Sequence, residues 1–130
     1  MKEVALGIDV GGTNTKFGFA DKSGNIYGEN SCETRGYPVF DDYLKHLHLE
    51  IEEAREALDF DVDIKGIGIG APNGNIYDGT IKDAPNLEWK ETVHIVEKLQ
   101  AYYQGIPIIL TNDANAAAIG ETTFGAAKGM

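Results

Sequence analysis

The sequence has 130 residues, in which 21 Asp and Glu outnumber 11 Lys and Arg and give a net charge of −10. This acidity argues against a nucleic-acid partner, because a phosphate backbone binds basic surfaces. Hydrophobic residues make up 42% of the chain, enough for one folded core, and the single Cys32 rules out an internal disulfide within it. No apolar run approaches the roughly 20 residues that span a bilayer, and Lys2 and Glu3 precede a strand-like segment instead of a secretion signal. We therefore expect a single α/β domain in the cytoplasm, without a membrane partner.

The first third of the chain predicts a three-stranded antiparallel meander. The apolar run 4–10 ends at two glycines, the alternating segment 16–20 ends at the polar turn 21–25, and residues 26–29 continue in extended form toward Cys32. Short turns rich in Gly and Asn join antiparallel strands. A Rossmann domain would place a helix directly after its first strand, so this order argues against one.

Helices and strands alternate in the rest of the chain. Apolar residues at spacings of three and four predict an amphipathic helix over residues 41–58, with Asp41 or Asp42 as its N-cap and with Glu52 among the acidic residues of a solvated face. The further predicted elements are a buried strand over 64–71, a small hairpin from 76–77, a helix over 88–103 that Gly105 ends, a strand over 107–111 and a helix over 114–121. A mixed sheet covered by helices follows from this order.

The first segment with chemical character is Asp9-Val10-Gly11-Gly12-Thr13, at the end of the first strand. Glycines let backbone N–H groups converge on an anion, because a Cβ would block the approach of phosphate oxygens. The carboxylate of Asp9 suits Mg²⁺ held through water beside the phosphates. A plain hairpin turn is the alternative interpretation of the two glycines. The glycines that alternate over residues 66–70 leave one strand face bare, but they lack the third glycine of a dinucleotide-binding turn.

Two further segments carry polar groups suited to a ligand. Asn112 and Asp113 follow the strand 107–111, at the edge where open α/β sheets bind ligands, although both residues are also good helix N-caps. Asn73 and Asn86 lie in loops whose amides suit sugar hydroxyls, and plain turns are the alternative there. The three histidines do not form a metal set, and Cys32 is interpreted as a strand residue and not as a nucleophile.

Together these motifs, in this order along the whole chain, resemble the ROK family (repressors, open reading frames and sugar kinases), and within it the bacterial glucokinases. The resemblance implies an actin-like, ribonuclease H-like lobe with an initial antiparallel meander. It implies that Asp9 to Thr13 form the first phosphate motif, that Asn112 and Asp113 bind the sugar with Asp113 as catalytic base, and that Asn86 and Asn73 lie near the sugar. Residues 1–130 would be the N-terminal lobe of a longer, two-lobed protein, whose other lobe holds further ATP motifs and a zinc site.

The resemblance implies an ATP- and Mg²⁺-dependent kinase that phosphorylates a hexose, glucose above all, at its 6-hydroxyl. One lobe alone would be inactive, and its exposed apolar surface would allow it to form a homodimer. Two alternatives from other classes stay open. One is a sugar-sensing transcriptional repressor of the same family, which would need a basic helix-turn-helix. The other is an actin-like ATPase module without kinase activity, which leaves Asn112 and Asp113 unexplained.

Overall fold

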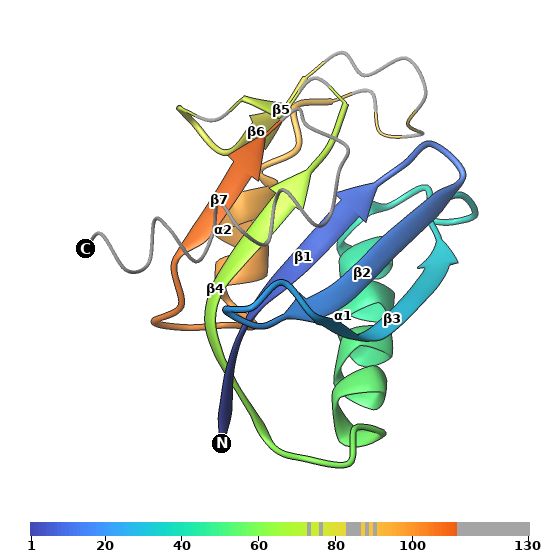
Figure 1. The fold of residues 1–130 in the computed structure, drawn as a ribbon. Coiled ribbons are helices and arrows are strands. Elements are labelled where there is room, and N and C mark those ends of the chain that lie inside the picture. The colour runs from blue at the N-terminus through green and yellow to red at the C-terminus, as the bar shows by residue number, and fades with distance from the viewer. Residues whose placement is uncertain (73, 76, 83–86, 88, 90, 112–130) are drawn as a thin grey trace.

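The computed structural model describes residues 1–72, 74–75, 77–82, 87, 89 and 91–111. A five-stranded sheet in the order β3-β2-β1-β4-β7 forms the centre of the molecule, and β5 and β6 form a separate two-stranded sheet (Figure 1). The elements in chain order are β1 (Lys2–Val10), β2 (Asn14–Ala20), β3 (Ile26–Glu33), α1 (Phe40–Glu56), β4 (Val62–Gly70), β5 (Gly74–Asn75), β6 (Thr80–Ile81), α2 (Ile95–Gln100) and β7 (Ile108–Thr111).

The central sheet is mixed. β2 runs antiparallel to both β1 and β3, whereas β1, β4 and β7 run parallel to one another. Parallel neighbours need crossover connections, and α1 and α2 lie in these connections on the same face of the sheet (Figure 1). The predicted meander and mixed sheet are therefore confirmed.

The two faces of the sheet differ in side-chain size, because successive residues of a strand point to opposite faces. In β1 the buried Leu6 and Ile8 belong to the hydrophobic core, together with Leu47 and Ile51 of α1. The intervening β1 residues are small or polar. Their partners in β2 and β4 are also mostly small, since Ala5 pairs with Ala20 and Gly66, and Gly7 pairs with Gly18 and Gly68. The bulky face packs on the helices, and each large side chain buried there stabilises the fold by about 1.5–3 kcal/mol.

Helix α1 begins at Phe40, and its N-cap Val39 makes no side-chain cap hydrogen bond, so the predicted capping by Asp41 or Asp42 is wrong. Both aspartates lie in the first helical turn, and Asp41 instead pairs with Lys98, whose Nζ is 2.7 Å from its carboxylate. Glu52 is also more than part of a solvated face. Its carboxylate accepts a hydrogen bond of 3.0 Å from the hydroxyl of Tyr103, just beyond α2.

Helix α2 is much shorter than the predicted helix over 88–103, which is wrong at both ends. Before the helix, Val93 is extended and exchanges two backbone hydrogen bonds of 2.9 Å with Ile81. After it, the chain turns, and the side-chain amide of Gln100 donates to the carbonyls of Tyr103 and Ile106. Long-range pairing thus overrides the local helical pattern. The small hairpin also begins earlier than predicted, because β5 starts at residue 74.

The strand predictions are confirmed in the described part of the chain, with β4 and β7 near their expected bounds and Cys32 buried in β3. The predicted helix over 114–121 lies outside the described residues. No helix among the described residues is long and apolar enough to span a membrane.

Candidate functional site

Three parallel strands end at the same edge of the sheet. Asp9 of β1 pairs with Gly70 of β4, and Gly70 pairs with Thr111 of β7. Because neighbouring strands lie about 4.8 Å apart, Asp9 and Thr111 are separated by about 10 Å. The β5–β6 hairpin lies at this edge, near the ends of β4 and β7 (Figure 1), and the amide of Ala71 donates to the Thr111 carbonyl at 3.0 Å.

The glycine motif forms the turn between β1 and β2. Val10 pairs with Thr15, and the Gly11 amide donates to the Asn14 carbonyl at 3.0 Å. A Cβ on Gly11 would lie 2.7 Å from that carbonyl oxygen. Gly11 is therefore required by the turn itself, whether or not a ligand also approaches it. Neither Gly11 nor Gly12 has a positive φ.

Two amides of the turn have no backbone partner among the residues that the structure describes. The Thr13 carbonyl accepts a hydrogen bond of 2.8 Å from the Thr34 amide. No backbone hydrogen bond between described residues outside the regular elements uses the amides of Gly12 or Thr13. The side chain of Thr13 is exposed and Asp9 is half-buried at the strand end. Backbone N–H groups beside a carboxylate suit a phosphate accompanied by a cation.

Lys16 is a candidate residue that the sequence analysis missed. It is the cross-strand partner of Asp9, so the two residues share one face of the sheet, and its side chain is exposed. It also lines a hollow of about 370 Å³ with Gly18, Glu29 and Ser31, among others. A cation on the face that carries Asp9 suits an anionic ligand. The alternation of residues 15–20 contains this signal, because Asp9 and Lys16 become partners once the turn is placed at residues 11–14.

Comparison with protein families matches residues 5–130 to the ROK family. The chain belongs to the ROK family. A glucokinase from Streptomyces coelicolor is 35% identical over 127 residues, which are 97% of this chain and 38% of that protein. A putative xylose repressor from a Caldicellulosiruptor species is 32% identical over 122 residues, 92% of this chain and 30% of the repressor.

A solved structure of a ROK family glucokinase from Streptomyces griseus, in complex with glucose and AMPPNP, is 30% identical. It matches with a TM-score of 0.70 over 94% of this chain and 37% of its own. This ROK chain therefore has the actin-like ATPase fold, as the resemblance implied. It spans well under half the length of these two glucokinases.

The predicted sugar-contacting residues of this ROK chain, Asn73, Asn86, Asn112 and Asp113, lie outside the described residues. Two neighbours of Asn86 are described. Leu87 and Trp89 are 2% and 3% exposed, and the Trp89 indole nitrogen donates to the Tyr37 carbonyl at 2.8 Å. The core thus holds the chain directly after Asn86.

The other polar groups give no second site in the described part of this ROK chain, where no cluster of three His, Cys, Asp or Glu suits a metal ion. His46 stacks on Tyr37 with ring centroids 5.2 Å apart. Burial raises the pKa of the Cys32 thiol to about 11, so the thiolate that a nucleophile needs is scarce. The interpretation of Cys32 as a strand residue agrees with this environment.

Proposed function

We propose that the chain is the N-terminal lobe of a two-lobed, ATP-dependent hexose kinase that transfers the γ-phosphoryl group of ATP to the 6-hydroxyl of glucose. The observation that carries this proposal is the shared register of Asp9, Gly70 and Thr111, which brings the glycine turn and the end of β7 to one sheet edge. The similarity to glucokinases supports the choice of reaction. Phosphoryl transfer needs mainly positioning and charge neutralisation, which a cleft between two lobes provides.

The glycine turn is the proposed binding place for the ATP phosphates. The amides of Gly12 and Thr13 would donate to phosphate oxygens, and the carboxylate of Asp9 would hold Mg²⁺ through water. Its half-buried position next to these amides fits that ion. Mg²⁺, when bound, neutralises charge on the phosphates. Lys16 would add a second positive charge on the same face.

Asp113 is the proposed catalytic base, and Asn112, Asn86 and Asn73 are the proposed sugar-binding residues. Asp113 is two residues beyond Thr111, so chain length alone keeps it within about 7 Å of the end of β7. A carboxylate there would accept the proton of the sugar hydroxyl as the new bond to phosphorus forms and would orient the oxygen. Helix capping, the competing role, makes a different forecast, because asparagine caps as well as aspartate does.

The test is Asp113→Asn in the two-lobed protein, assayed by coupled phosphorylation of glucose. Loss of a general base should lower kcat by about 10²–10⁴-fold, with a nearly unchanged melting temperature. A near-normal kcat would reject Asp113 as the base. Residues 1–130 alone should show no turnover, because one lobe supplies only one wall of the cleft. Turnover by this chain alone would refute the two-lobed proposal.

A sugar-sensing repressor is the second candidate, favoured by the similarity to the putative xylose repressor. It would bind a sugar without phosphorylating it, and a separate segment of the protein would bind DNA. Sugar binding without ATP turnover, combined with sugar-dependent retention on operator DNA, would favour the repressor over the kinase.

A further inference from the structure

A buried group of three hydroxyls lies next to the glycine turn. The Thr15 hydroxyl oxygen is 2.7 Å from that of Thr34 and 2.7 Å from that of Tyr43. The three residues come from β2, from the position directly after β3 and from α1, and none is more than 2% exposed. Buried hydroxyls without partners are costly, so this network favours one relative arrangement of the three elements.

Both threonines are connected to the backbone of the turn. Thr15 pairs with Val10, where β1 enters the turn and β2 leaves it. The Thr34 amide donates to the Thr13 carbonyl at 2.8 Å, and the Thr34 hydroxyl contacts that of Thr15. Movement of either threonine therefore moves the backbone that carries the amides of Gly12 and Thr13.

Tyr43 connects this network to helix α1 and to the hydrophobic core. Its ring packs on Trp89 and Phe40, with centroids 4.6 and 5.8 Å away, so the ring has little room to move. The hydroxyl that the ring carries therefore has a fixed position. Burial raises the pKa of Tyr43 far above its usual range, so this hydroxyl keeps its proton and stays neutral.

A phosphate-binding turn of this composition gains from support by neighbouring elements. Donors that are already in position bind a ligand more tightly, because ordering them on binding would cost affinity. Gly11 and Gly12 have no side chains that could hold the turn, and glycine has more backbone freedom to lose than any other residue. Hydrogen bonds from β2, α1 and the end of β3 supply order without placing a side chain in the phosphate space.

We propose that Tyr43 and Thr34 are positioning residues for the nucleotide, which hold the glycine turn, through Thr15 and the Thr13 carbonyl, in the arrangement that receives the ATP phosphates. This inference rests on the proposed function of the turn. A group that orders the turn before ATP binds contributes equally to the bound complex and to the transition state. Its loss therefore raises KM for ATP and leaves kcat nearly unchanged.

The test compares Tyr43→Phe with Tyr103→Phe in the two-lobed protein. Both variants keep an aromatic ring and remove one buried hydroxyl. The Tyr103 hydroxyl contacts Glu52 and His48 of α1 and does not belong to the network beside the turn. Steady-state kinetics give kcat and the KM values for ATP and glucose, and calorimetry gives the affinity for a non-hydrolysable ATP analogue.

We expect Tyr43→Phe to raise KM for ATP, and Kd for the analogue, by about three- to tenfold, the net contribution of about one hydrogen bond. KM for glucose and kcat should stay close to the parent values, and Tyr103→Phe should change none of these constants. If Tyr43→Phe leaves KM for ATP unchanged, or if Tyr103→Phe raises it equally, the proposal is overturned.

Amide hydrogen exchange without ligand is the second measurement. The amides of Gly11 and Thr34 donate to carbonyls of the glycine turn, whereas the amide of Gly24 donates within the β2–β3 turn. Tyr43→Phe should speed the exchange of the first two amides and leave that of Gly24 unchanged. Equal acceleration in both turns would indicate a general loss of stability and would overturn the proposal.

A second variant covers the case in which Tyr43→Phe does not fold. Thr34→Val then replaces it, with the same expected results, because this variant keeps the amide that holds Thr13 and removes the hydroxyl that contacts Thr15.

The proposed function can fail separately. A parent protein that binds nucleotide and glucose but transfers no phosphate would contradict the kinase, and the calorimetric and exchange measurements would still decide whether Tyr43 positions the turn. A parent protein without affinity for the nucleotide would overturn this inference together with the proposed phosphate site.

Discussion

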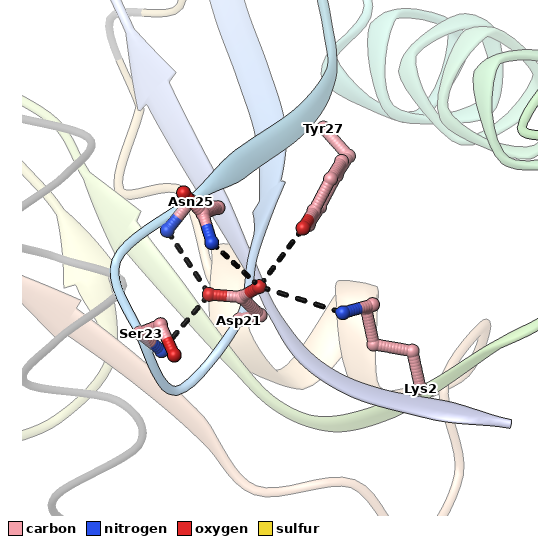
Figure 2. Close-up of polar contacts among 5 residues, drawn as sticks. All are labelled: Lys2, Asp21, Ser23, Asn25 and Tyr27. Carbon is pink, nitrogen blue, oxygen red and sulfur yellow. Dashed lines mark hydrogen bonds and ion pairs between the residues drawn. The ribbon is translucent and has the colours of Figure 1, made fainter.

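The β1–β2 and β2–β3 turns have similar compositions, but their backbone amides differ in whether they are hydrogen-bonded within the turn. Each begins with an aspartate and contains glycine and a small polar residue, Asp9 to Asn14 in one and Asp21 to Asn25 in the other. In the β2–β3 turn the carboxylate of Asp21 accepts hydrogen bonds from the amides of Ser23 and Asn25, at 2.9 and 3.0 Å (Figure 2). In the β1–β2 turn, the amides of Gly12 and Thr13 make no such bond to described residues.

The Asp21 carboxylate also accepts a hydrogen bond of 3.0 Å from the Tyr27 hydroxyl, and it lies 3.6 Å from the ammonium group of Lys2 (Figure 2). Burial by itself raises the pKa of Asp21, but the hydrogen bonds from Asn25, Tyr27 and Ser23 outweigh it and lower the pKa to about 2. In the β2–β3 turn, the carboxylate of Asp21 therefore occupies the backbone amides of its own turn. In the β1–β2 turn, the amides of Gly12 and Thr13 have no such partner among the described residues, and amides of this kind suit an external anion.

If only the β1–β2 turn binds phosphate, the largest effect on ATP affinity is expected from Gly12→Val. Its side chain would occupy the proposed phosphate space and displace hydrogen bonds to a charged ligand, so ATP affinity should fall by about 10–100-fold. Hexose affinity should stay close to that of the parent protein. Separate calorimetric titrations with a non-hydrolysable ATP analogue and with glucose measure the two affinities. An unchanged affinity for the nucleotide would show that the β1–β2 turn does not bind the phosphates.

Gly11→Ala should destabilise the β1–β2 turn itself. The new Cβ would lie 2.7 Å from the Asn14 carbonyl oxygen, a backbone atom held by the adjoining strand pair. Overpacking of this kind costs about 1–3 kcal/mol, to be measured as the free energy of unfolding in urea. A parent-like stability would show that the turn adapts and that Gly11 serves the ligand instead.

Asp21→Asn should lower stability at neutral pH, by less than Gly11→Ala, because an amide cannot accept all of the hydrogen bonds that the carboxylate receives. The folded-state pKa of about 2 lies below the ordinary value of 3.8, so the carboxylate stabilises the fold above about pH 4, and this contribution is lost as the pH falls toward 2. Thermal unfolding of parent and variant should therefore differ at pH 7 and converge near pH 2.

Asp63→Asn is the matched control for the Asp21 experiment. Asp63 makes an ion pair of 2.9 Å with Lys65, but both side chains are more than 40% exposed. Exposed ion pairs contribute little to stability. A difference between Asp21→Asn and the parent that persists unchanged at pH 2 would contradict the role assigned to the carboxylate.

The smallest effect on the ligand site is expected from Gly24→Ala in the β2–β3 turn. Gly24 has a φ of +88°, and a Cβ there would meet no atom within 4 Å, so the cost is only that of the left-handed conformation, about 1–2 kcal/mol. Gly24→Asn should recover part of it, because asparagine tolerates this region. Ligand affinity should not change in either variant, which makes them controls for the glycine turn.

Much of the fold could be predicted from local patterns. Apolar runs and one alternating segment predicted the meander and the strands β4 and β7, and the spacing of apolar residues predicted α1, because these patterns depend on neighbours no more than four positions apart. The helix over 88–103 failed for the converse reason. Val93 pairs with Ile81 across a turn of the chain, and no local pattern contains that pairing.

The site divides in the same way. The sequence by itself determined the glycine turn and the succession of motifs that marks the ROK family, since both are contiguous stretches of chain. Only the tertiary structure decided that Gly11 is needed for the turn, that Lys16 faces the same side as Asp9, and that Tyr43 reaches Thr15 across 28 positions of the chain. The roles of Asn73, Asn86, Asn112 and Asp113 stay predictions. Contacts between distant residues form only when the strands have their final register. That register is selected by the burial of apolar side chains across the whole core, which no short stretch of sequence contains.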